Sequence, residues 1–276
     1  MRVHPFLHSH EPLIIAHRGA SALAPENTLA AFARAFKDEA DGLELDVHLA
    51  RDGVPVVIHD SSLRRTGLTI GNVGEMTSKQ LSQVNVGSWF NRAKPRFARE
   101  KYSREHLPTL AETLAFFKRT MAERSNSMLY VELKTEERAG VTRELIESTV
   151  ELVRHYSIRA HIVVISFDLK TVALVKQVDS GIRTGALWAP QTRVSATIRK
   201  RRMLAAARDC AADEILLHRL LASRGTVELA VENNLSPVVW TVDHPAWVQR
   251  ARNWEIHALI TNNPAKLKAA GMLKFT

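Results

Sequence analysis

Short apolar runs alternate with helix-forming stretches along most of the chain, and this alternation limits the fold more than any other feature. Eight runs have the character of buried strands, and all but the second are followed fairly directly by a helix. Such alternation implies an α/β protein with a parallel sheet and right-handed crossovers. In a chain of 276 residues a closed TIM (β/α)8 barrel is the most economical architecture, and an open doubly wound sheet is the alternative. The predicted strands cover residues 13–16, 42–47, 128–132, 161–166, 181–187, 213–217, 237–242 and 256–261.

The helical stretches carry local signals of their own. Leu29, Phe32, Ala33 and Phe36 follow the i, i+3, i+4, i+7 spacing of an amphipathic helix. Thr109, with Glu112 three residues later, predicts a capping box at the start of a helix that runs to about residue 124. Further helices are predicted at 139–156, 168–178, about 194–209, 223–233 and 245–252, and from about residue 264.

The alternation breaks after a short extra strand at 54–58. We expect a small insertion at about 60–107, after the second strand, within a single barrel domain that spans 1–276. A segment of this length without regular structure in a compact domain is usually functional. Its last part is crowded with basic side chains, namely Arg92, Lys94, Arg96, Arg99, Lys101 and Arg104.

The net charge of +9 and the isoelectric point near 9.9 favour anionic partners such as phosphate substrates or acidic lipid surfaces. No nucleic-acid-binding motif accompanies the basic residues, so a nucleic-acid partner is not expected. The basic run at 199–202 is interpreted as the solvated part of a helix. No G-x-G-x-x-G follows the first strand, which argues against a dinucleotide-binding fold.

The cysteine content, the apolar runs and the N-terminal residues bear on the cellular location of the protein. The single cysteine, Cys210, excludes an intrachain disulfide, and no apolar run approaches the roughly 18 residues of a membrane span. Residues 1–12 lack the pattern of a secretory signal. We therefore predict a cytoplasmic protein, and we leave the oligomeric state open.

Chemically active side chains gather at the predicted strand ends. His17 and Arg18 end the first strand, and His59 ends the extra strand. Because strand residues two apart share a face, Glu44 and Asp46 point the same way. In a TIM barrel the carboxyl ends of the strands meet at one mouth. The third strand adds Glu132 and Lys134 to that mouth.

Three acids at one mouth suggest a metal site. Buried carboxylates are costly unless they are paired or bind a cation. Oxygen ligands suit Mg²⁺ or Ca²⁺, whereas zinc prefers histidine or cysteine. Two alternatives stay open: the face with Glu44 and Asp46 is half exposed, or Glu132 and Lys134 form a simple ion pair.

Four motifs share one β-α-β segment: H-R-G at 17–19, P-E-N-T at 25–28, E-x-D at 44–46 and H-D at 59–60. Their order and spacing resemble those of the glycerophosphodiester phosphodiesterase family. The resemblance covers nearly the whole chain, including Glu132-Leu133-Lys134 and Trp240-Thr241-Val242. It implies a metal-dependent TIM-barrel enzyme that hydrolyses small-molecule glycerophosphodiesters to glycerol 3-phosphate and an alcohol.

The resemblance also implies roles for individual residues. It makes His17 and His59 the catalytic acid and base, in an order that the sequence leaves open. It makes Arg18, Lys134 and Trp240 substrate contacts. The implied metal ligands are Glu44, Asp46 and Glu132.

Two departures from the family pattern are expected to lie outside this site. Asn262 stands where the family often has Asp, and the glycine usual before the seventh strand is replaced near Asn234-Leu235.

Two other functions are kept as alternatives. One is a lysophospholipase D or sphingomyelinase D-like lipid phosphodiesterase, for which the basic insertion favours peripheral contact with a lipid surface. The other is a non-enzymatic phosphate- or nucleic-acid-binding protein on a decayed barrel.

Overall fold

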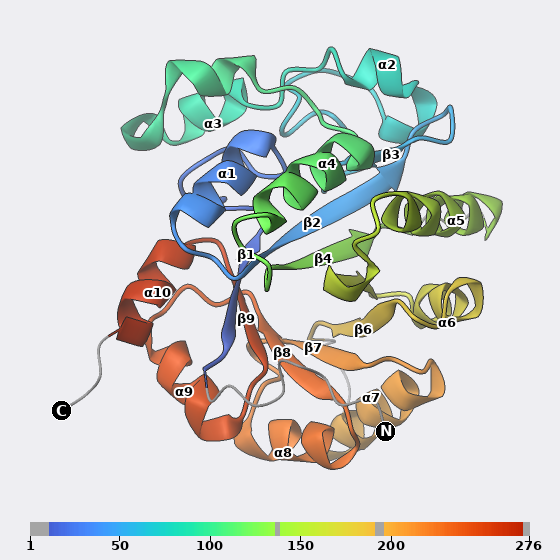
Figure 1. The fold of residues 1–276 in the computed structure, drawn as a ribbon, viewed down its shortest axis with the longest axis vertical. Helices are drawn as coiled ribbons and strands as arrows, with labels where there is room; N and C mark the ends of the chain where they lie inside the picture. The colour runs from blue at the N-terminus through green and yellow to red at the C-terminus, as the bar shows by residue number, and fades with distance from the viewer. Residues whose placement is uncertain (1–10, 136–138, 191–195, 273–276) are drawn as a thin grey trace.

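A closed ring of strands forms the centre of the computed structural model, which describes residues 11–135, 139–190 and 196–272 (Figure 1). Within these residues eight parallel strands pair side by side, and the ring closes because β1 pairs with both β2 and β9. The predicted barrel is confirmed, and the open sheet is wrong. The barrel strands are β1 (Leu13–His17), β2 (Gly42–Leu49), β4 (Met128–Leu133), β5 (Ile162–Ser166), β6 (Arg183–Trp188), β7 (Glu214–His218), β8 (Ser236–Trp240) and β9 (Ala258–Thr261).

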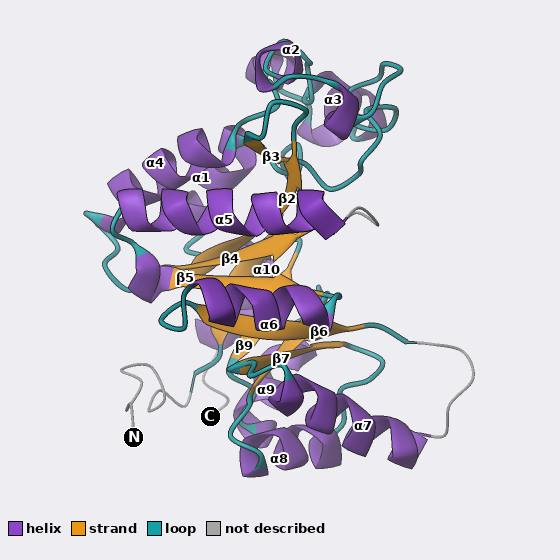
Figure 2. Ribbon diagram, turned by 90° about the vertical axis from the view of Figure 1, so that its right-hand side faces the viewer, coloured by secondary structure: helices purple, strands orange, loops and turns teal. Residues whose placement is uncertain are grey.

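Helices surround the barrel on the outside (Figures 1 and 2). They begin and end within a few residues of the predicted bounds. On α1 the chain buries Phe32, Ala35 and Phe36 against the strands, whereas Ala33 faces solvent, so the prediction for Ala33 is wrong. The predicted capping box at Thr109 and Glu112 is confirmed. The helices are α1 (Leu29–Lys37), α4 (Leu110–Met121), α5 (Ala139–His155), α6 (Leu169–Val178), α7 (Ala196–Asp209), α8 (Arg224–Glu232), α9 (Ala246–Trp254) and α10 (Pro264–Met272).

The structure of the helices tests two predictions made from the sequence, one about the basic run at 199–202 and one about membrane spans. On α7, Arg201 and Arg202 are exposed and Lys200 donates to Ser223 Oγ at 3.0 Å, as expected for a solvated helix; the side chain of Arg199 lies outside the described residues. Among the described helices, none is both long enough and apolar enough to cross a membrane. Most of the segment examined for a secretory signal, residues 1–10, also lies outside the described residues.

Strand β2 is longer than its neighbours and carries the insertion. Its first six residues pair with β4 inside the barrel, and its last three pair antiparallel with β3 (Pro55–Val57). Strand β3 returns the chain to the barrel and brings His59 to the mouth. The insertion that follows was predicted without elements and contains short ones: η1 (Val73–Glu75), α2 (Ser78–Leu81), α3 (Ser88–Ala93), η2 (Pro95–Phe97) and η3 (Glu100–Arg104).

The insertion packs onto the loop between β1 and α1 and onto the first turn of α1. The rings of Phe90 and Tyr102 lie edge to face at 5.7 Å and are buried against Ala24 and Ala31. Tyr102 Oη donates to the carbonyl of Leu23 at 3.3 Å. Lys94 Nζ donates to the carbonyl of Ser21 at 3.1 Å, so this basic residue fixes the insertion in place. Because that loop follows β1, the insertion borders the mouth of the barrel.

A buried ion pair lies at the opposite end of the barrel, where β6 and β7 begin. Arg183 Nη2 contacts Glu214 Oε1 at 2.7 Å, and the Glu214 side chain is fully buried. Removing one partner of a buried pair typically costs about 3–5 kcal/mol, because the other charge stays buried alone. We expect Glu214→Ala to lower the free energy of unfolding in urea by that amount. Glu228→Ala, which breaks an exposed pair with Arg224, should change it by less than about 1 kcal/mol; equal losses would contradict this prediction.

Candidate active site

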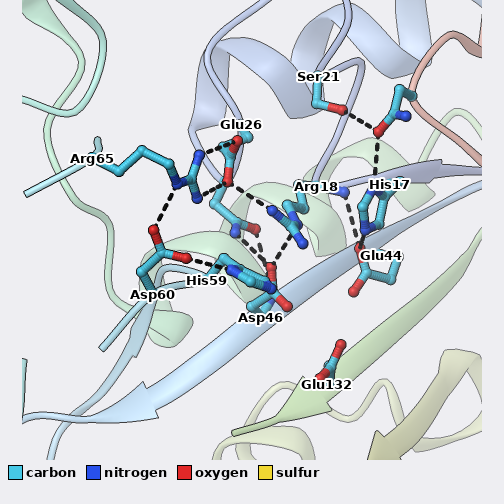
Figure 3. A network of polar contacts seen from close by, with 12 residues as sticks. His17, Arg18, Ser21, Glu26, Glu44, Asp46, His59, Asp60, Arg65 and Glu132 are labelled. Carbon is cyan, nitrogen blue, oxygen red and sulfur yellow. Dashed lines mark hydrogen bonds and ion pairs between the residues drawn. The ribbon is translucent and has the colours of Figure 1, made fainter. Parts of the chain in front are cut away.

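Three carboxylates converge at the carboxyl ends of β2 and β4 (Figure 3). Glu44 and Asp46 alternate with apolar residues on β2, and Asp46 lies in register with Glu132 on β4. Their exposed fractions are 2%, 0% and 7%, so the half-exposed alternative is wrong. One oxygen from each carboxylate lies within 4.8 Å of the others. That spacing and donor chemistry fit a hard divalent cation.

Two cationic side chains of the chain itself contact the same carboxylates. Arg18 Nε lies 3.1 Å from Asp46 Oδ2. Lys134 Nζ lies 2.8 Å from Asp46 Oδ1 and 2.5 Å from Glu132 Oε1. The ion-pair alternative for Glu132 and Lys134 is therefore correct as a contact, and it coexists with the acid cluster.

A tight turn after β1 delivers Arg18. Arg18 and Gly19 have positive φ angles of 54° and 78°. A Cβ at position 19 would lie 2.7 Å from the backbone of Ala31, so only glycine fits the H-R-G turn. In this conformation the Arg18 amide donates to Glu44 Oε2 at 3.0 Å. The turn thus ties the first strand to the acid cluster.

The local cations do not fully satisfy the acids. Burial alone would raise the pKa of Asp46, but Lys134 and Arg18 lower it below its ordinary value. Burial and the Asp46 charge raise the pKa of Glu132 to about 7, and the same causes raise that of Glu44. Raised pKa values mean that negative charges at Glu44 and Glu132 are poorly compensated. The cluster therefore retains affinity for a further positive charge.

The side chain of Asn262, which directly follows β9, holds His17. Its Nδ1 lies 2.8 Å from Asn262 Oδ1, and Asn262 Nδ2 donates to Asp243 Oδ2 at 2.8 Å. Because the Asp243 oxygens accept hydrogen bonds from Thr261 Oγ1 and from both nitrogens of Asn262, the amide oxygen of Asn262 faces His17, whose Nδ1 therefore donates. In the neutral ring the lone pair is then on Nε2, which lies 3.9 Å from Glu44 Oε2. Burial, followed by the Arg18 charge, lowers the pKa of His17 to about 4.

The prediction that Asn262 lies outside the site is therefore wrong. Asn262 is next to His17 only because β9 pairs with β1 when the barrel closes. The other departure, Asn234-Leu235, lies between α8 and β8, where strands enter the barrel rather than at the mouth.

His59 belongs to a second network that spans the mouth (Figure 3). Its Nδ1 lies 2.6 Å from Asp60 Oδ1, and Arg65 Nε donates to Asp60 Oδ2 at 2.6 Å. Arg65 also contacts Glu26 at 2.7 Å, and Glu26 accepts from Arg18 at 2.9 Å. Although burial would raise the pKa of Asp60, hydrogen bonds from Arg65 and His59 lower it to about 2. Asp60 is thus ionised beside His59.

Sequence reasoning missed several members of these networks. Glu26, Asn27 and Asp60 belong to the P-E-N-T and H-D motifs, so the signal was present, but their partners were not deducible. Asn27 Nδ2 donates to Asp46 Oδ2 at 2.8 Å and holds that carboxylate. Arg65 had no signal of its own within the insertion.

A cavity of about 540 Å³ opens beside the cluster on the His59 side. Trp240 does not line it, but its ring lies 5.5 Å from that of Phe167, which does. The other predicted site residues are joined by the hydrogen bonds and ion pairs above. The lining residues include His59, Arg64, Glu132, Lys134, Ser166 and Phe167.

The arrangement combines three chemical abilities. The carboxylates can hold a divalent cation, the cations can neutralise an anionic group, and two histidines can move protons. Cleavage of a phosphate diester can use each of them, because the anionic charge must be neutralised, the attacking oxygen must lose a proton and the leaving oxygen must gain one.

Comparisons with known proteins point to the same chemistry. Residues 17–266 match the sequence profile of the glycerophosphoryl diester phosphodiesterase family. The glycerophosphodiester phosphodiesterase of Bacillus subtilis (strain 168) is 29% identical over 262 residues, covering 91% of this chain and 84% of that protein. The one from Caldanaerobacter subterraneus subsp. tengcongensis is 33% identical over 181 residues, covering 64% and 66%. A solved Oleispira antarctica phosphodiesterase, in complex with the product sn-glycerol-3-phosphate, has the same fold, with a TM-score of 0.77, 24% identity and coverage of 96% and 98%.

Proposed function

Because the chain belongs to the glycerophosphoryl diester phosphodiesterase family, we propose that its mouth-end site performs the family's reaction with the residues described above. The protein is a phosphoric diester hydrolase that converts glycerophosphodiesters to glycerol 3-phosphate and an alcohol. The observation that carries the assignment of residues is the convergence of three buried carboxylates, two cations and two histidines at one mouth.

We assign the metal site to Glu44, Asp46 and Glu132. Their oxygen donors and uncompensated charge suit Mg²⁺ or Ca²⁺. A cation bound there supplies positive charge that stabilises the phosphodiester's developing negative charge.

The chain's own residues perform the remaining steps. Arg18 and Lys134, both at the edge of the acid cluster, bind and orient the anionic phosphate. One histidine takes the proton of the attacking oxygen, and the other protonates the leaving alkoxide. Trp240 and Phe167 form the apolar wall against which the organic part of the substrate packs.

The His17 and His59 environments assign these two roles. His17 donates to a neutral amide and presents the Nε2 lone pair on the Glu44 side, which suits a general base. His59 contacts the ionised Asp60, which favours its protonated form and suits a general acid. Burial lowers the pKa of both rings, and the shift of His17, to about 4, is the larger of the two.

A substrate panel tests this proposal. We expect release of glycerol 3-phosphate from glycerophosphocholine and other glycerophosphodiesters in the presence of divalent cations. Lysophosphatidylcholine should be a poorer substrate, because the cavity beside the cluster is bounded by polar side chains such as Ser166 and Lys134. Preferential cleavage of the lysolipid would favour the lipid phosphodiesterase alternative. Salt-sensitive DNA binding without any phosphodiesterase activity would favour the decayed barrel.

We further propose that the insertion belongs to one domain with the barrel, because Phe90, Tyr102 and Arg65 join it to the loop after β1. The partner is a small-molecule phosphodiester, and no nucleic-acid partner is proposed. The cytoplasmic location stays a prediction.

A further inference from the structure

Large apolar side chains are exposed mainly around the mouth of the barrel. Leu68, Ile70 and Phe97 belong to the insertion, which borders the mouth. Phe167 and Leu220 follow the carboxyl ends of β5 and β7. Among the described residues, the other exposed large apolar side chains are Val231 on α8 and Met272 on α10. Apolar surface is therefore concentrated on the face that holds the active site.

The most exposed of these side chains lie at the tip of a narrow loop. Residues 61–63 and 71–73 form its two arms: Ser62 pairs antiparallel with Asn72, and the Leu63 amide donates to the Gly71 carbonyl at 3.0 Å. The tip between the arms presents Leu68 and Ile70, with exposed fractions of 46% and 84%. Ser61, Ser62 and Arg64 of the same loop line the cavity. The apolar tip thus extends from a loop that reaches the cavity, while Leu68 and Ile70 themselves are not among the residues that line it.

Exposed cations accompany this apolar surface. Arg64, Arg96, Arg99 and Lys101 are exposed, and none forms an ion pair with a residue that the structure describes. The Arg96 guanidinium lies 5.8 Å from the Phe97 ring. The whole chain carries +9. Exposed apolar side chains among basic ones are the combination that binds the interface of an anionic bilayer.

We propose that this mouth face docks on an anionic lipid surface. Leu68 and Ile70 insert at the interface, and Arg64, Arg96, Arg99 and Lys101 contact lipid headgroups. Docking places the cavity opening close to the bilayer, where diesters derived from lipids arise. The inference goes beyond the proposed function, because binding to a surface requires no hydrolysis.

Sedimentation of the full chain with vesicles of equal parts phosphatidylglycerol and phosphatidylcholine tests the proposal. We expect binding that weakens with salt and is much weaker to vesicles of phosphatidylcholine alone. The double variant Leu68→Ser/Ile70→Ser should bind about tenfold or more weakly, because two apolar side chains no longer leave water. Neutralising Arg96, Arg99 and Lys101 to Gln should weaken binding by a similar factor and flatten its dependence on salt. The matched control Val231→Ser, on α8, should bind like the unmodified chain.

Turnover of soluble glycerophosphocholine, measured on the same variants, shows whether a variant that no longer binds vesicles is still folded and active. Leu68→Ser/Ile70→Ser should retain the turnover and melting temperature of the unmodified chain, since neither side chain contacts the catalytic residues. Absence of vesicle binding by the unmodified chain, or equal binding by the double variant, would overturn the proposal whether or not the protein hydrolyses diesters. A third outcome would also overturn the proposal: the unmodified chain forms a dimer, the double variant does not, and neither binds vesicles. That result would assign the face to a second copy of the chain.

Discussion

Chelation of divalent cations abolishes hydrolysis of glycerophosphodiesters, and added Mg²⁺ or Ca²⁺ restores it: this is the largest effect that we expect. Arg18 and Lys134 contact the acids but leave the charges of Glu44 and Glu132 poorly compensated. Without a further cation the site lacks the positive charge that offsets the negative charge of the phosphodiester. Activity should therefore fall to background after dialysis against EDTA.

Conservative variants locate the effect at the proposed ligands. Glu44→Gln, Asp46→Asn and Glu132→Gln should each raise the concentration of Mg²⁺ or Ca²⁺ needed for half-maximal activity, because each removes one charged ligand. Glu228→Gln, which changes an exposed acid on α8, should leave that concentration unchanged. Full activity in excess EDTA would show that the acid cluster serves only to hold Arg18 and Lys134.

The second large effect concerns the two histidines. His17→Ala and His59→Ala should each lower kcat by about 10²–10⁴, the usual contribution of a general acid or base. Metal affinity and melting temperature should change little. Because the two residues act in one proton relay, the double variant should lose less than the product of the single losses. His155→Ala, at the exposed end of α5, is the control and should keep full turnover.

A substrate with an activated leaving group distinguishes the two roles. A nitrophenyl phosphodiester needs little protonation of its leaving oxygen, so it should restore much of the turnover of His59→Ala. It should not restore that of His17→Ala, because the attacking oxygen still needs a base. Equal rescue of both variants, or rescue of His17→Ala alone, would contradict the assignment drawn from Asn262 and Asp60.

The positions of side chains that depend on local periodicity were predicted correctly from the sequence. Glu44, Asp46, Glu132 and Lys134 were located correctly, because strand alternation decides which side chains face the barrel mouth. Prediction from the sequence failed for contacts between distant segments. Asn262 and His17 are 245 residues apart in the sequence, and Arg65 and Glu26 are 39 residues apart. Sequence reasoning also missed the short helices of the insertion, which have three to six residues and are too short to show a hydrophobic period.

The pairing of β1 with β9 has a consequence for how the protein is made. Leu13–Ala16 hydrogen-bond with Ala258–Thr261, and the residue that orients His17 follows directly after. A nascent chain that has left the ribosome as far as β8 already contains both histidines and all three carboxylates. It lacks the strand that closes the ring and the amide that sets the tautomer of His17. Hydrolytic competence therefore requires that β9 and Asn262 have left the ribosome, and a shorter nascent chain carries the chemical groups without their alignment.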